Sequence, residues 1–145
     1  LYLHEKVKAF VSLTHGEGFG LPLFEAAYSG LPVVAPGWSG HLDFLTDENG
    51  KEHFYNVSFD IQPVQKEAEW KGVVDPGSMW SFARENSAKD QMRQCYNDVV
   101  SGDNDFPCEY AIKLQDRFSE QKLYSDFVNC IESLPNSQEA QVVVL

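Results

Sequence analysis

The chain has 145 residues, of which 43% are hydrophobic and 13% aromatic, so it is long and apolar enough for one globular domain, which argues against disorder throughout. Its formal net charge of −11 disfavours nonspecific binding to nucleic acid or to an anionic membrane surface, because both are also negative. No apolar run approaches the roughly 20 residues that span a bilayer and no signal peptide opens the sequence, so we expect a cytoplasmic protein without a transmembrane segment. Cys95, Cys108 and Cys130 are widely spaced, which favours reduced thiols over disulfides or a structural zinc site.

A glycine-rich turn between two apolar runs carries the clearest structural signal. Ala9 to Leu13 is a short run of strand formers, and the turn His15 to Gly20 follows it directly. Pro22 suits the start of a helix that Gly30 ends. Val33 to Ala35 is continuously apolar, as expected for a strand buried on both faces. Together these elements predict a right-handed βαβ unit and therefore an α/β fold with a parallel sheet.

The same turn has a chemical consequence. Backbone N–H groups of Gly20, Leu21 and the next non-proline residue are expected to be unpaired at the helix N-terminus, where a phosphate group is well received. Glu17 lies in the turn, and Glu25, which we place in the first helical turn, follows eight positions later (25 − 17 = 8). Carboxylates accept hydrogen bonds from sugar hydroxyls while amides hold phosphate, a combination that suits a nucleotide sugar.

The segment HGEGFGLPLFEAAYSGLPVV resembles the signature of glycosyltransferase family 4 (group 1), in which two glutamates separated by seven residues lie in the donor half of a GT-B enzyme. The likeness is specific over about residues 1–45 and loose beyond. It implies a Rossmann-like parallel sheet flanked by helices. It also implies retaining transfer from a nucleotide diphosphate sugar to an acceptor such as a glycan or lipid-linked sugar, without a metal or other cofactor.

The resemblance also assigns roles to individual residues. Glu17 would be the catalytic-site residue that contacts hydroxyls of the donor sugar, without acting as a nucleophile, and Glu25 would contact the ribose. The backbone groups that face the diphosphate and the leaving sugar would belong to Gly18, Phe19, Gly20 and Leu21.

The resemblance further implies that residues 1–134 form part of a C-terminal nucleotide-sugar-binding domain, followed by a polar tail at 135–145. The acceptor-binding domain and an Arg/Lys pair that neutralises the diphosphate would lie upstream. Lys6 and Lys8 do not match that pair by position. We therefore interpret the chain as a fragment and expect weak nucleotide binding at best, without transfer.

The glycine-rich turn also has other interpretations. A dinucleotide-binding G-x-G-x-x-G pattern fails because its third glycine would fall at Leu21 or Leu23. A G-x-x-x-x-G-K-[ST] phosphate loop is also absent, since Glu52 follows Gly50-Lys51. The glycines could simply form a tight turn. A GT-B phosphorylase, a nucleotide-sugar epimerase and a noncatalytic nucleotide-binding remnant remain alternatives.

The middle of the chain yields coarser expectations. Ser39 is predicted to cap a short helix at His41 to Leu45, with Trp38 or His41 either bordering a pocket or packing the loop. Phe54 to Pro63 is predicted as one strand, and an aromatic cluster at 79–83, after a turn at 75–77, is expected to anchor to the sheet.

The later elements are predicted from caps and periodicity. Ser87-x-x-Asp90 indicates a capping box for an amphipathic helix that Gly102 ends, and two further helices carry Tyr110, Ala111, Leu114 and Phe118, then, after a Ser119 cap, Leu123, Phe127, Ile131 and Leu134. The Asp103-Asn104-Asp105 run is interpreted as a turn, so no metal is assigned. A structural role is expected for His15, a helical turn for residues 1–7, and a docked strand or an exposed end for residues 142–145.

Overall fold

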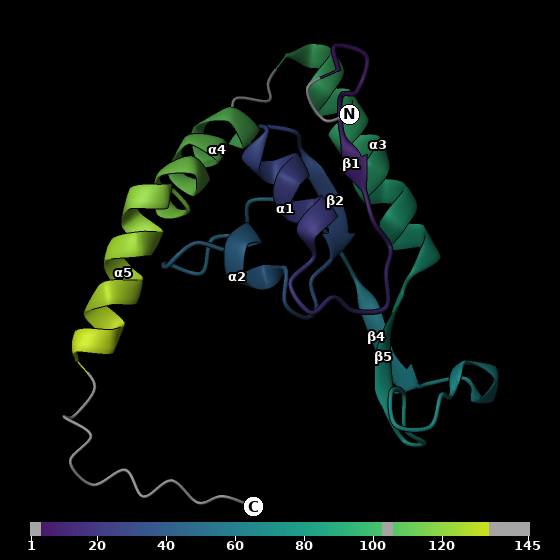
Figure 1. The fold of residues 1–145 in the computed structure, drawn as a ribbon. Helices are drawn as coiled ribbons and strands as arrows, with labels where there is room; N and C mark the ends of the chain where they lie inside the picture. Colours follow the sequence, from purple (N-terminus) through teal and green to yellow (C-terminus); the bar gives the residue numbers. More distant parts are fainter. Residues whose placement is uncertain (1–3, 103–105, 134–145) are drawn as a thin grey trace, which may run out of the picture. The chain divides into compact units, whose positions relative to one another are not determined.

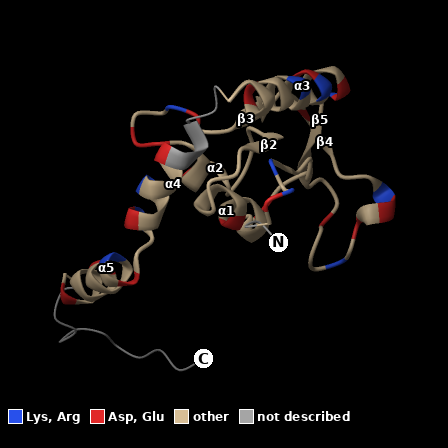
Figure 2. Ribbon diagram, turned by 90° about the horizontal axis from the view of Figure 1, so that it is seen from above, with Lys and Arg blue, Asp and Glu red and all other residues tan. Residues whose placement is uncertain are grey.

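The computed structural model describes residues 4–102 and 106–133. The described residues fall into two compact units, divided between Leu114 and Gln115. The first unit contains a three-stranded parallel sheet with the order β1-β2-β3, formed by Phe10–Val11, Val33–Pro36 and Tyr55–Val57 (Figure 1). Helix α1 (Leu21–Tyr28) lies on one side of the sheet and α3 (Glu85–Ser101) on the other (Figure 2). The predicted α/β fold, a parallel sheet flanked by helices, is confirmed and is compatible with a Rossmann-like arrangement.

The predicted βαβ unit is present. β1 and β2 pair in parallel, with Phe10 opposite Val33 and Val11 opposite Val34, and α1 makes the connection between them. All residues of β2 are buried, as its apolar sequence predicts. Gly30 ends α1 with a φ of 81°: its N–H donates to the Ala27 carbonyl, and the Leu31 N–H donates to the Ala26 carbonyl, both at 3.0 Å. This pair of bonds is a Schellman cap, so the predicted role of Gly30 is confirmed.

The strand predicted over residues 54–63 is divided at Ser58. β3 joins the parallel sheet beside β2, whereas β4 (Phe59–Pro63) pairs antiparallel with β5 (Met79–Ala83). The aromatic cluster at 79–83 therefore belongs to a second, two-stranded sheet and is not anchored to the first by strand pairing. A short 3₁₀ helix, η1 (Lys66–Ala68), and the predicted turn at 75–77, closed by Ser78 N–H on the Asp75 carbonyl, lie in the connection.

Helix α3 begins earlier than predicted. It starts at Glu85 with Arg84 as its N-cap, so the expected Ser87 capping box is wrong. The Ser87 hydroxyl instead accepts the Ser58 N–H at 2.9 Å, at the point where β3 ends. Gly102 ends the helix with a φ of 76°, as predicted. Ala88 and Cys95 are buried in the core cluster with Val34 and Val57, and this burial raises the pKa of the Cys95 thiol to about 11.

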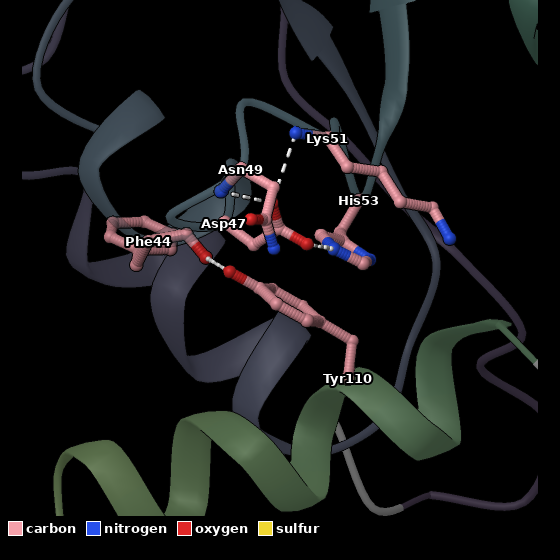
Figure 3. Close-up of polar contacts among 6 residues, drawn as sticks. All are labelled: Phe44, Asp47, Asn49, Lys51, His53 and Tyr110. Atoms are coloured by element: carbon pink, nitrogen blue, oxygen red, sulfur yellow. Dashed lines mark hydrogen bonds and ion pairs between the residues drawn. The ribbon is translucent and has the colours of Figure 1, made fainter.

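The first turns of α4 (Phe106–Arg117) pack against the segment that follows α2 (Leu42–Leu45). Tyr110 is buried; its hydroxyl donates to the Phe44 carbonyl at 2.8 Å and its ring stacks on His53 at 3.7 Å (Figure 3). His53 Nε2 lies 2.9 Å from Asp47 Oδ2, and Asp47 Oδ1 accepts the N–H groups of Asn49 and Lys51 (Figure 3). One carboxylate therefore orders the loop on which α4 rests.

Acid is expected to weaken this loop. The hydrogen bond from His53, followed by that from the Lys51 amide, lowers the pKa of Asp47 to about 2, against roughly 3.9 in an unfolded chain. A carboxyl whose pKa is lower in the folded state contributes stability that is fully present above its unfolded pKa and is lost as the pH falls through its folded pKa. Asp47→Asn should therefore be less stable than the wild type near pH 5, and the difference should shrink toward pH 2 when urea unfolding is followed by circular dichroism.

Asp126→Asn, on the exposed surface of α5, is the control. A stability difference for Asp47→Asn that stays constant between pH 5 and pH 2 would contradict the expected role of the Asp47 carboxylate.

The second unit contains helix α5 (Glu120–Glu132), whose Ser119 N-cap accepts the Lys122 N–H at 3.4 Å, as predicted. The residues of its predicted apolar face, Leu123, Phe127 and Ile131, are exposed. Residues 4–7 form a turn closed by the Val7 N–H on the His4 carbonyl at 2.8 Å, and residues 1–3 of the expected helical turn lie outside the described residues. The Asp103–Asp105 run, Leu134 and the tail at 135–145 lie outside the described residues. Within the described ranges, no helix has both the length and the apolar character required to cross a bilayer.

Candidate functional site

Two loops meet at the carboxyl ends of the parallel strands. One connects β1 to α1 over residues 12–20, and the other connects β2 to α2 over residues 37–41. Parallel strands bring such loops to the same edge of the sheet, which is where open α/β sheets bind ligands. All of the predicted site residues except Glu25 lie in the first loop or at the start of α1.

The second loop holds the main chain of Glu17 on both sides. Ser39 Oγ accepts the Glu17 N–H at 2.6 Å and donates to the Glu17 carbonyl at 2.7 Å. The Gly40 N–H also donates to this carbonyl, at 3.0 Å. Ser39 adopts a φ of 81°, the only left-handed conformation of a non-glycine residue in the described part of the chain. Such an outlier in a loop at a sheet edge is a feature of functional sites.

Glycines allow the two loops to come this close. A Cβ added to Gly40 would lie 1.9 Å from the Gly18 carbonyl oxygen. A Cβ on Gly20, whose φ is 86°, would lie 3.2 Å from the Cβ of His41. The loops therefore contact each other through their backbones, with no room for a side chain at Gly40.

No side chain caps the N-terminus of α1. Gly20 is the N-cap and receives no side-chain cap, and Pro22 has no N–H. Among the described residues, none accepts a hydrogen bond from the amides of Gly20, Leu21 or Leu23. These amides supply the positive end of the helix dipole, as the sequence predicts for an anion site. Neither α1 nor α2 carries Lys or Arg (Figure 2), so the amides are the donors that this part of the site offers to an anion.

The two glutamates differ in exposure. Glu17 is half-buried and Glu25 is exposed, and neither carboxylate bonds to a described residue. Glu25 is in the second turn of α1, since the helix begins at Leu21; its predicted place in the first turn is wrong. Both carboxylates are thus free of protein partners within the described structure and can accept hydrogen bonds from hydroxyl groups.

Phe19 and Leu21 present apolar side chains beside these amides. They are 40% and 57% exposed. The Phe19 ring also packs on Phe24 and Phe44, with centroid distances of 5.4 and 4.9 Å. This packing of the Phe19 ring against core residues holds the backbone between Gly18 and Gly20 in place.

Three predicted neighbours of the site differ in their contacts. His41 is buried, with Nε2 donating to the Pro36 carbonyl at 2.7 Å, so it packs beneath the loop and does not border an open pocket. Trp38 is 37% exposed and its ring packs on that of Phe59, with 5.9 Å between the ring centroids. His15 Nδ1 bonds to the Ser81 carbonyl at 2.7 Å and its ring stacks on Trp80, consistent with the structural role expected.

Sequence reasoning missed the role of Ser39. The expected helix cap is wrong, because α2 has His41 as its N-cap without a side-chain bond, and the Ser39 hydroxyl is engaged by Glu17. The available signal was the Gly-Trp-Ser-Gly segment directly after a buried strand, which favours a loop in close backbone contact.

Among the described residues, no group of three His, Cys, Asp or Glu side chains is placed to hold a metal ion. Comparison with known proteins gives no match to any protein-family model, to any curated protein or to any solved structure.

Proposed function

We propose that this chain is the donor-binding part of a retaining glycosyltransferase of the GT-B type, which transfers a sugar from a nucleotide diphosphate sugar to a glycan or lipid-linked acceptor. One observation supports this most directly: two carboxylates without described partners accompany an uncapped helix N-terminus at the carboxyl edge of a parallel sheet.

Each component has a role in the proposed reaction. The amides of Gly20 and Leu21 accept the diphosphate and stabilise the negative charge that grows on it as its bond to the sugar breaks. Glu17 binds hydroxyls of the sugar and Glu25 those of the ribose, so that the donor is held in a productive orientation. Backbone at Gly18 and Phe19 faces the leaving group. The acceptor and the cations that neutralise the diphosphate are supplied by parts of the parent protein upstream of this sequence.

A second candidate is a noncatalytic nucleotide-binding module. The loops at 12–20 and 37–41 contain no Lys or Arg, so the chain by itself offers a diphosphate only dipolar groups. Binding without transfer by the whole parent protein would favour this candidate.

Calorimetric titration with UDP, GDP, ADP and their common sugar conjugates tests the proposal. We expect weak binding of one nucleotide, and Glu25→Ala should weaken it by about three- to tenfold through loss of one hydrogen bond at an exposed site, worth about 1 kcal/mol. Glu17→Gln should leave the affinity for the nucleotide unchanged and reduce only the additional affinity given by the sugar.

Glu132→Gln, an exposed carboxylate on α5, is the matched control and should bind as the wild type does. If Glu25→Ala and Glu132→Gln behave alike, the proposed ribose contact is wrong. Binding of every nucleotide and of inorganic diphosphate with one common affinity would indicate a general anion site.

A further inference from the structure

The hydroxyl of Ser39 makes two bonds to one residue that is distant in sequence. It accepts the Glu17 N–H and donates to the Glu17 carbonyl, at 2.6 and 2.7 Å, across a separation of 22 residues. Together these bonds fix the peptide planes on both sides of the Glu17 Cα. Rotation of the side chain then remains the main freedom of its carboxylate.

The backbone conformation at Ser39 favours glycine. A left-handed conformation costs an L-residue about 1–2 kcal/mol, and the Ser39 φ of 81° lies in that region. Glycine would adopt the left-handed conformation without this energetic cost, but it would provide no hydroxyl to bond to Glu17. The strained serine is therefore accounted for by its two bonds to Glu17.

From these contacts we propose that Ser39 is a positioning residue: it fixes the main chain at Glu17, and so the point from which the Glu17 carboxylate reaches the donor sugar. The inference rests on the proposed function, which it extends by assigning to the β2–α2 loop a role in sugar recognition and not in nucleotide recognition. Ser39 acts through Glu17 and does not itself touch the donor. The bonds from Ser39 fix the main chain of Glu17 alone. The nucleotide contacts of Gly20, Leu21 and Glu25 are therefore expected to be independent of Ser39.

Three variants separate this role from a general effect on folding. Ser39→Ala removes the hydroxyl but keeps the strained backbone, whereas Ser39→Gly removes the hydroxyl and relieves the strain. Ser87→Ala is the matched control, because its half-buried hydroxyl also accepts a backbone N–H, that of Ser58 at 2.9 Å, in a part of the fold without a proposed ligand role. If Ser39→Ala does not fold, Ser39→Gly carries the test.

The first measurement is amide hydrogen exchange of the ligand-free protein by NMR. Loss of one hydrogen bond is expected to speed exchange of the Glu17 amide by roughly fivefold to tenfold in Ser39→Gly. In Ser87→Ala the Ser58 amide should be affected and the Glu17 amide should not. An unchanged Glu17 amide in Ser39→Gly would overturn the inference without touching the proposed function.

The second measurement is the ratio of affinities for a nucleotide diphosphate sugar and for the same nucleotide diphosphate, by calorimetry. We expect Ser39→Gly to reduce this ratio to that of Glu17→Gln, with the nucleotide affinity within about twofold of the wild type. A wild-type ratio in Ser39→Gly, or an equal loss of both affinities, would overturn the positioning role. A wild type that binds no nucleotide sugar would overturn the proposed function and with it the role in sugar recognition, whatever the exchange data show.

Discussion

Gly40→Ala is expected to lower the free energy of unfolding by about 1–3 kcal/mol, the usual range for forcing extra volume into a packed region. The added Cβ would lie 1.9 Å from the Gly18 carbonyl oxygen and 2.9 Å from that of Glu17, and neither is the end of a flexible side chain. The two loops would have to separate, which would also break the Gly40 N–H bond to Glu17. Urea unfolding followed by tryptophan fluorescence measures the loss.

Gly18→Ala is the matched control for this substitution. It adds a methyl group to the opposite side of the same contact, but its Cβ would meet nothing within 4 Å. We expect its stability to stay within about 0.5 kcal/mol of the wild type, as for most surface substitutions. Equal losses in the two variants would show that the approach of Gly40 to Gly18 is not what makes glycine necessary.

Phe44→Ala is expected to have the largest effect on stability, a loss of about 3–5 kcal/mol, because it removes a large fully buried ring and leaves a cavity. The Phe44 ring lies 4.9 Å from that of Phe19 and 5.3 Å from that of Phe24. It therefore supports the site loop and α1 at once. Urea unfolding at neutral pH, followed by circular dichroism, measures the loss.

Phe127→Ala makes the same chemical change at a side chain on α5 that is 64% exposed, and should cost less than about 0.5 kcal/mol. A comparable loss in both variants would mean that burial of Phe44 is not the source of its contribution. Because Phe19 loses its support in Phe44→Ala, we also expect faster amide exchange between Gly18 and Gly20 in that variant.

The βαβ unit followed from the sequence because its signals are local. A run such as Val33 to Ala35 favours a buried strand whatever surrounds it, and Gly30 and Gly102 end helices through their own left-handed conformations. The uncapped amides at the start of α1 were predicted for the same reason, since the few residues around Gly20 determine whether a side chain caps the helix. Glu25 falls just outside the first turn because α1 starts at Leu21, one residue before the predicted start at Pro22, and the first residue of a short helix depends on where its first hydrogen bonds can form.

Tertiary contacts decided what the sequence could not. Ser58 divides a predicted strand because its N–H bonds to Ser87, 29 residues away, and the Ser39 hydroxyl reaches Glu17 across 22 residues. A serine near a helix start favours a cap when only its neighbours are considered, yet its hydroxyl can form other hydrogen bonds once a distant backbone comes within reach. The sequence by itself thus determined the α/β unit and its uncapped helix N-terminus. Only the tertiary structure fixes the main chain of Glu17, because long-range contacts bring the β2–α2 loop against the β1–α1 loop. Local sequence patterns do not encode such contacts.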